Sequence, residues 1–158
     1  MKRRDLVELW KMMDLYKGTK GVKFAYFLVR NKKKLQPEIE ALEESLSPSE
    51  AFKGYDTERV KLAEFYSDKG PTGNPIVQNA NYLITEKIDE FNTELTSLKE
   101  KYKSVIDERE QQITDYNKML DEETEFDGFK ISLAILPEEV DSRFIEVLMD
   151  TNLLDEPE

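Results

Sequence analysis

Carboxylates, lysines and tyrosines are the side chains left for chemistry in this 158-residue chain, because it contains no cysteine and no histidine. The missing cysteine excludes disulfides, thiolate zinc sites and cysteine nucleophiles. The missing histidine excludes a Ser-His-Asp triad and most transition-metal sites. No spacing of the remaining groups singles out an acid–base pair. We therefore predict a non-enzymatic protein with no catalytic residue, no cofactor and no metal site.

The acidic run from Asp121 to Asp127 is the best candidate for calcium, since a carboxylate site needs neither missing residue type. An EF-hand loop that begins at Glu123 places Gly128 at its sixth position, as the motif requires. Its twelfth position, which needs a bidentate carboxylate, is Ala134. The motif fails there, so we predict a solvated loop.

The glycines of residues 70–75, GPTGNP, resemble those of a phosphate-binding loop. The segment lacks the Gly-Lys-Ser/Thr ending that a phosphate loop needs, and no helix start follows it. We predict a turn.

A cluster of cations is the candidate site for a polyanion: Arg30, Lys32, Lys33 and Lys34. Residues 1–35 carry eleven basic and three acidic residues, a charge of +8, so residues 36–158 carry −19 of the total of −11. Clustered cations bind phosphates by releasing counterions, but an acidic body repels nucleic acid. The stronger expectation is a solvated helix face that pairs with the acidic long helix predicted over residues 85–123.

The longest predicted element is a helix over residues 85–123, since no glycine or proline occurs from Ile76 to Asp127. Apolar residues recur there at steps of four and three, which is coiled-coil spacing; they are Ile84, Ile88, Phe91, Leu95, Leu98, Tyr102 and Val105. The stripe then changes phase into a second series, for which we predict a partner-binding role: Ile106, Ile113, Tyr116 and Leu120.

Shorter helices are predicted over residues 5–16 and 22–46, with a third that begins at Asp56 or Thr57 and a last one after Pro137. Within 22–46, Pro37 predicts a kink or a break. Asn31 lies on the apolar stripe, where a polar side chain can specify register. Alternating apolar residues or turn signals predict strands within 76–84 and 129–136.

Together these elements predict a mainly α fold with a minor β-sheet, in the α+β class. The helix over 22–46 is expected to pair antiparallel with residues 84–105, and a two- to three-stranded sheet lies at one end. The length predicts a single domain over 1–158. Residues 106–123 are expected to protrude, and 155–158 to form a frayed acidic tail.

No apolar run reaches the length of a membrane span, and charges interrupt the N-terminal segment where a signal peptide would be apolar. We therefore expect a soluble protein that is not secreted and has no membrane partner.

Three segments carry a resemblance to a known group of proteins. They are Ala25-Tyr26 with Asn31, the turn from Asp68 to Pro75, and Leu136-Pro137. Over residues 22–98 and 129–154 the chain resembles small uncharacterised proteins from tailed-phage genomes, although 99–123 is longer than expected for that group. The resemblance implies a phage origin, a location in the host cytoplasm or the virion, and a place in virion assembly. It implies no site residues.

Two functions follow as hypotheses. The first is a phage-encoded protein–protein interaction, assembly or accessory protein whose partner is another protein or a second copy of itself. The alternative is an acidic viral inhibitor that mimics nucleic acid and occupies a host nucleic-acid-binding enzyme, since 34 acidic residues can imitate a phosphate ladder. Nucleic acid itself is not the expected partner.

Overall fold

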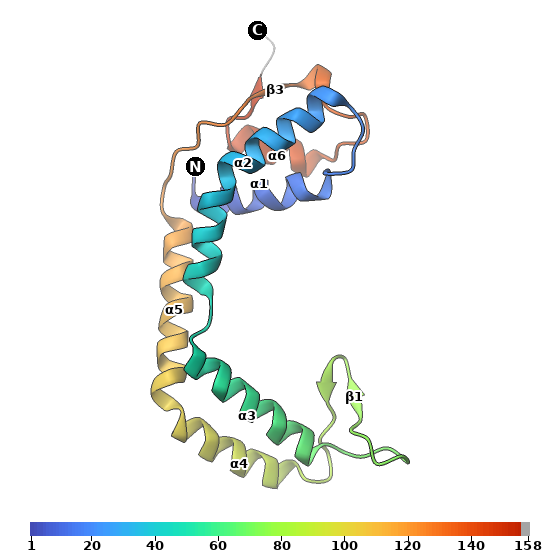
Figure 1. Cartoon of the computed structure of the whole chain (residues 1–158), viewed down its shortest axis with the longest axis vertical. Helices are drawn as coiled ribbons and strands as arrows, with labels where there is room; N and C mark the ends of the chain where they lie inside the picture. Colours follow the sequence, from blue (N-terminus) through green and yellow to red (C-terminus); the bar gives the residue numbers. More distant parts are fainter. Residues whose placement is uncertain (156–158) are drawn as a thin grey trace. The chain divides into compact units, whose positions relative to one another are not determined.

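The computed structural model describes residues 1–155, and the chain groups into two compact units. Unit 1 comprises Met1–Leu46 together with the chain from Thr114 onward, and unit 2 comprises Ser47–Ile113. The described residues form six α-helices and two small two-stranded sheets (Figure 1). The mainly α fold class with minor β structure is therefore confirmed, while two units stand where the length predicted one domain.

Unit 1 is built on three helices around an apolar core. Helix α1 (Arg3–Leu15) packs against both α2 (Val22–Leu46) and α6 (Ser142–Asp150). The short strand β3 (Ile131–Ser132) pairs in parallel with β4 (Leu154–Asp155). The amphipathic spacing of the helices directs one face of each inward. The most deeply buried side chains of this core are Leu9, Met13, Phe24, Leu35, Phe144, Leu148 and Leu153.

Asn31 fixes the segment that enters β3 onto α2. The side chain of Asn31 is fully buried, and its Nδ2 donates to the carbonyls of Phe27 at 3.1 Å and Phe129 at 2.9 Å. The Phe129 amide donates back to Asn31 Oδ1 at 2.8 Å. A Cβ on Gly128 would lie 2.4 Å from Leu153 Cδ2 and 2.7 Å from Asn31 Oδ1, so only glycine fits beside this amide. The buried amide thus holds the backbone of Phe129 against α2.

The end of α6 directs the chain into β4. Asn152 adopts the left-handed conformation, with φ 55°. Its amide donates to the Met149 carbonyl at 2.9 Å, and the Leu153 amide donates to the Leu148 carbonyl at 2.7 Å. This is a Schellman cap with asparagine in the place of glycine. The Leu153 carbonyl then accepts from the Ile131 amide at 2.8 Å, which aligns the two strands.

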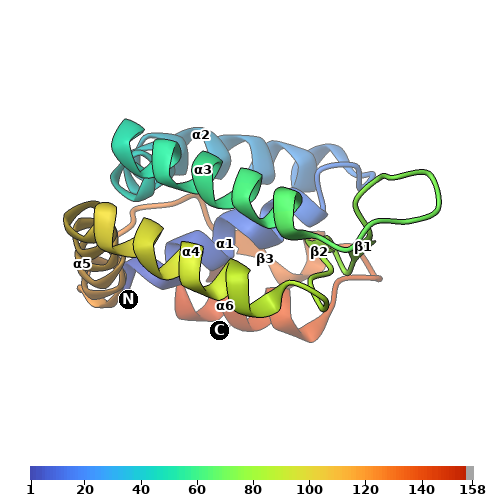
Figure 2. The same cartoon turned by 90° about the horizontal axis from the view of Figure 1, so that it is seen from below.

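Unit 2 is a helical hairpin with a β-hairpin at its connection. Helices α3 (Glu50–Tyr66) and α4 (Ile88–Lys101) pack against each other and lie side by side in both Figures 1 and 2. Strands β1 (Val77–Gln78) and β2 (Asn81–Tyr82) pair antiparallel between them. Helix α5 (Lys103–Asp121) begins in this unit and ends in unit 1.

Asp68 joins the β-hairpin to the start of α4. Its carboxylate accepts from the Thr85 hydroxyl at 2.6 Å and from the Thr85 amide at 3.0 Å. Its backbone amide donates to the Leu83 carbonyl, and its carbonyl accepts from the Ile76 amide. The hydrogen bonds from Thr85 hold the pKa of the Asp68 carboxyl below its ordinary value. The connection between the two helices is thereby held at both ends.

The helix predicted over residues 85–123 is interrupted at Tyr102, which separates α4 from α5. Tyr102 has φ −106° and ψ 18°, outside helical geometry. Its hydroxyl donates to Glu58 at 2.6 Å, and its ring centroid lies 5.6 Å from that of Tyr55, so α3 holds this side chain. Spacing did not reveal the break, because Tyr102 fits the apolar stripe that runs through it.

The start of α3 differs from prediction, whereas α2 bends along its course without a break, in keeping with the predicted kink (Figure 1). Helix α3 begins at Glu50 rather than at residue 56 or 57, because Ser49 caps it by accepting from the Phe52 amide at 3.2 Å. The helix then continues through Gly54, which lies in open space. Helix α2 continues through Pro37, so no break occurs there.

The predicted pairing of elements is not the observed one. Residues 77–82 pair with each other in unit 2, and β3 pairs with β4 in unit 1, so the expected single sheet is two separate sheets. Of the predicted strand 129–136, only Ile131–Ser132 form a strand, and the 3₁₀ turn Leu133–Ile135 follows directly. The antiparallel pair of long helices is not confirmed, since α4 packs on α3 and α2 packs on α1. The predicted tail lies outside the described residues, except for Asp155 in β4.

Replacing Asn31 with alanine should destabilise unit 1 by about 1–3 kcal/mol, because the Phe129 amide and carbonyl lose their buried partner. Urea unfolding followed by the fluorescence of Trp10, which packs against the unit 1 core, measures this change. Lys33→Ala, at an exposed position of the same helix, is the matched control and should shift stability by less than about 0.5 kcal/mol. Equal effects of the two replacements would contradict the role given to Asn31.

Replacing Ala80 with glycine should stabilise the β-hairpin of unit 2 by about 1 kcal/mol. Asn79 and Ala80 both have positive φ, 48° and 62°, as a type I′ turn requires, and alanine is strained there. Hydrogen-exchange protection of the Leu83 amide, which bonds to the Ile76 carbonyl, measures the change. Asn79→Gly should stabilise the hairpin less, because asparagine tolerates this conformation. A larger effect of Asn79→Gly than of Ala80→Gly would contradict the proposed backbone strain at Ala80.

Candidate functional site

The seam between α3 and α4 is aromatic at both ends. The rings of Tyr55 and Tyr102 have centroids 5.6 Å apart at one end, and those of Tyr66 and Phe91 lie 6.3 Å apart at the other. Residues that face a partner helix recur every three or four positions, and these four fit that rule along their helices. The two helices are thus joined along most of their length.

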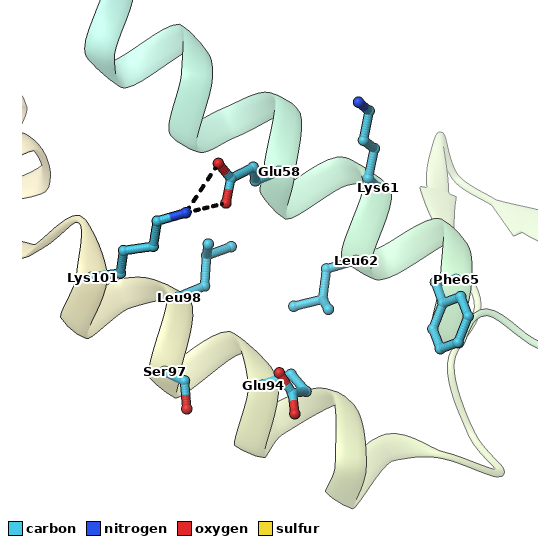
Figure 3. A pocket seen from close by; sticks show the side chains of 8 residues that line it. All are labelled: Glu58, Lys61, Leu62, Phe65, Glu94, Ser97, Leu98 and Lys101. Atoms are coloured by element: carbon cyan, nitrogen blue, oxygen red, sulfur yellow. Dashed lines mark hydrogen bonds and ion pairs between the residues drawn. The ribbon is translucent and has the colours of Figure 1, made fainter.

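Between these ends lies an open groove of about 490 Å³, the candidate functional site of unit 2 (Figure 3). Leu62 from α3 and Leu98 from α4 point into the space between the helices and are half-buried. Phe65 is 69% exposed at one end of the groove. The groove is lined by Glu58, Lys61, Leu62, Phe65, Glu94, Ser97, Leu98 and Lys101.

Glu58 closes the other end of the groove by joining α3 to α4. Lys101 Nζ lies 2.9 Å from its Oε2, and the Tyr102 hydroxyl donates to its Oε1 at 2.6 Å. These hydrogen bonds, that of Tyr102 first, hold the pKa of the Glu58 carboxyl below its ordinary value. The same carboxylate raises the pKa of Lys101 and the pKa of Tyr102. At neutral pH Glu58 and Lys101 are therefore charged and Tyr102 is neutral, and these three side chains join α3 to α4.

The charged side chains of the groove balance each other. Helix α3 contributes Glu58 and Lys61, and α4 contributes Glu94 and Lys101. Each helix thus supplies one carboxylate and one cation, and the groove has no net formal charge within a chain of charge −11. A binding surface of this composition favours an apolar partner surface that carries both signs of charge.

Unit 2 buries little of its apolar surface. Tyr55 is the one buried apolar side chain among its described residues, and no residue of α4 is classed as buried. The seam residues Phe91, Leu95 and Leu98, which the sequence predicted to be buried against residues 22–46, are half-buried. Two helices in one layer leave the outer part of their seam in solvent.

The predicted partner-binding stripe on α5 is divided between the two units. Ile106 and Ile113 belong to unit 2, and Tyr116 and Leu120 belong to unit 1. Ile113 is 40% exposed, and the other three are half-buried. Ile106 also lines a second groove of about 340 Å³ beside Tyr55. A role for this stripe stays a prediction.

The predicted polyanion site is largely occupied by contacts within unit 1. Lys32 Nζ lies 2.6 Å from Asp14 and 4.3 Å from the centroid of the Trp10 ring. Lys34 pairs with Asp127 at 3.2 Å.

The other two cations of this cluster differ from each other. The Arg30 guanidinium stacks 4.1 Å from the centroid of the Phe129 ring, and Lys33 is exposed. Two of the four cations in the cluster are thus paired with carboxylates of α1 and of the loop after α5, not with the long helix as predicted. Polyanion binding stays a prediction.

The structure also describes the segments that the sequence raised as candidates for a phosphate loop, a metal site or a membrane span. Residues 70–75 form a turn in which the Gly70 amide donates to the Asn74 carbonyl at 2.9 Å. Within residues 1–155, no group of three or more acidic side chains is arranged to hold a metal ion. None of the described helices has the length and apolar character needed to cross a membrane.

Comparisons with known proteins give this chain no relative: no family model, no curated protein and no solved structure matches it. The resemblance to tailed-phage proteins gains no support from them. The geometry of the two units is therefore the basis for a functional proposal.

The sequence predicted the apolar residues of the third helix but not their shared groove with residues 94–101. A signal was present in the spacing: Tyr55, Leu62 and Tyr66 recur at steps of seven and four, as seam residues of a helix pair do. The predicted helix start at Asp56 or Thr57 left Tyr55 outside the helix and so hid this spacing.

Replacing Tyr102 with phenylalanine should raise the pKa of Glu58, since the hydrogen bond from Tyr102 is the largest cause of its lowering. A carboxyl with a lowered pKa stabilises the fold above its ordinary pKa and loses that contribution as the pH falls through the lowered value. The variant should therefore lose this contribution at a higher pH. An NMR titration of the Glu58 carboxyl carbon measures the shift.

Tyr66→Phe is the matched control for this titration, because Tyr66 lies in the same seam and contacts Phe91 instead. The control should leave the Glu58 titration unchanged. An unchanged titration in the Tyr102 variant would contradict the proposed hydrogen bond.

Proposed function

We propose that this protein is a non-enzymatic protein-interaction module and that the α3/α4 groove of unit 2 is its binding surface. The observation that supports this proposal is the open groove over the apolar side chains of Leu62 and Leu98, with Phe65 69% exposed at its end. Continuous apolar surface rimmed by charged groups marks interaction sites in soluble proteins. An exposed aromatic ring beside a groove is also the type of residue that contributes most to binding.

The shape of the groove favours a helix as its ligand. Helices α3 and α4 run along its two sides, and their 17 and 14 residues span about 25 and 21 Å. An amphipathic helix can place its apolar face into such a groove, in the manner of helix-in-groove recognition. The bound helix would contact Leu62, Leu98 and Phe65, and Glu58 and Lys101 would lie at one end of the groove.

A phage origin and a role in virion assembly belong to this proposal, but they rest on the sequence resemblance alone. No observation favours charge mimicry over protein binding. Asp14 pairs with Lys32, Asp121 with Arg4, and Glu58 with Lys101, so carboxylates and cations are interspersed at these places. Interspersed charge of this kind is a poor imitation of a phosphate ladder.

Photo-crosslinking in the cell that naturally makes the protein tests the groove. Phe65 is replaced with p-benzoylphenylalanine, which its exposure should permit, and ultraviolet light should join it to a specific polypeptide. The captured polypeptide is identified by mass spectrometry and bound again in purified form. Leu62→Lys should weaken that binding at least tenfold, because it places a charge on the apolar floor.

The matched control carries the same photoreactive group at Val22, which is 88% exposed in unit 1. It should not give the same adduct. Circular dichroism of Leu62→Lys checks that the helices persist. If position 65 gives no adduct, or an adduct that the folded Leu62 variant retains, then the groove is not the binding surface.

A further inference from the structure

We infer that the partner of the α3/α4 groove is the same groove of a second copy of this chain, so that two hairpins form a symmetric four-helix bundle. This inference rests on the proposed function, because it identifies the occupant of the same surface. It concerns unit 2 alone, whose residues supply every contact used in the argument.

The first argument is charge complementarity. The groove has two carboxylates, Glu58 and Glu94, and two cations, Lys61 and Lys101, and each helix carries one of each sign. A strongly acidic or basic partner would leave half of these charges facing their own sign, which costs binding energy. A second copy brings two carboxylates and two cations, so the paired grooves stay neutral. The remaining charge of the chain, −11 in total, lies elsewhere on the protein.

The second argument is the missing layer. A symmetric dimer uses the same patch on both copies, so an incomplete helix layer can complete itself. A hairpin supplies two of the four helices of a bundle, and its partner supplies two of matching length. The half-buried residues Leu62 and Leu98 and the exposed Phe65 would then gain apolar neighbours. No other segment has to be assumed for this closure.

The size of the surface sets the expected affinity. A face about 20 Å wide, from two helices of about 10 Å diameter, and about 21 Å long covers about 400 Å² on each copy. About 800 Å² in total lies below the standard size of protein interfaces. The dimer should therefore be of the weak, reversible class, and sedimentation equilibrium of the full chain between about 1 and 300 μM should detect it at 0.15 M salt.

A charge-exchange experiment tests whether the groove pairs with itself. Glu94→Lys gives the groove a formal charge of +2, and Lys61→Glu gives it −2; neither replacement removes a member of the ion pair between Glu58 and Lys101. Each variant alone should dissociate at least tenfold more readily than the natural chain, because like charges then face each other. An equimolar mixture should recover heterodimers with a dissociation constant within about threefold of the natural one.

Glu44→Lys and Lys23→Glu are the matched controls, since they make the same changes of net charge at exposed positions of α2 in unit 1. They should leave the natural dimer unchanged. Leu62→Lys is an independent test for the case in which the charge variants lose their helices, and it should give monomers. Circular dichroism shows whether the charge variants keep their helices.

Two results would overturn the inference: a natural chain that stays monomeric to 300 μM, or charge variants that behave as their controls do and gain nothing on mixing. A monomeric chain whose position 65 still forms a Leu62-dependent adduct with a different polypeptide would remove the self-pairing and leave the binding groove standing. A monomer with no such adduct would remove both.

Discussion

Unit 2 depends on how much of its apolar surface two adjacent helices can cover. A pair of helices shares one line of contact, and side chains on either side of that line remain partly in water. In α3 and α4 this leaves Leu62, Leu98 and Phe91 half-buried although they lie on the seam. Hydrophobic stabilisation follows the apolar area removed from water, so each of these residues contributes less than the same residue in unit 1.

The hairpin compensates with directed contacts at its ends. The Glu58 carboxylate binds both Lys101 and Tyr102, and Asp68 binds Thr85 where the connection reaches α4. Hydrogen bonds and ion pairs of exposed groups contribute little stability each, but they set the position and direction of the helices. The groove therefore has defined walls while its floor stays open to solvent, and this combination suits a surface that binds.

Unit 1 shows which parts of the fold could be predicted. The apolar faces of residues 5–16 and 22–46, with Asn31 among them, are largely those that the structure buries, because local spacing determines which side of a helix is apolar. The pairing of β3 with β4 was missed, since it depends on the turn at Asn152 and on the close approach of Gly128 to Asn31. Such contacts join segments that are distant in the sequence and leave no periodic pattern.

The candidate site was missed for a related reason. Coiled-coil spacing in residues 84–105 predicts that a helix needs a partner, but it does not identify the partner. Residues 22–46 and 50–66 both carry apolar side chains at helical spacing, and the basic charge of the first favours it as the partner of an acidic helix. Exposed ion pairs are worth only about 0–1 kcal/mol, so they do not decide between two such faces. The aromatic contact of Tyr55 with Tyr102 and the connection over residues 67–87, which Asp68 anchors, decide instead. Elements that follow each other in the sequence usually lie side by side.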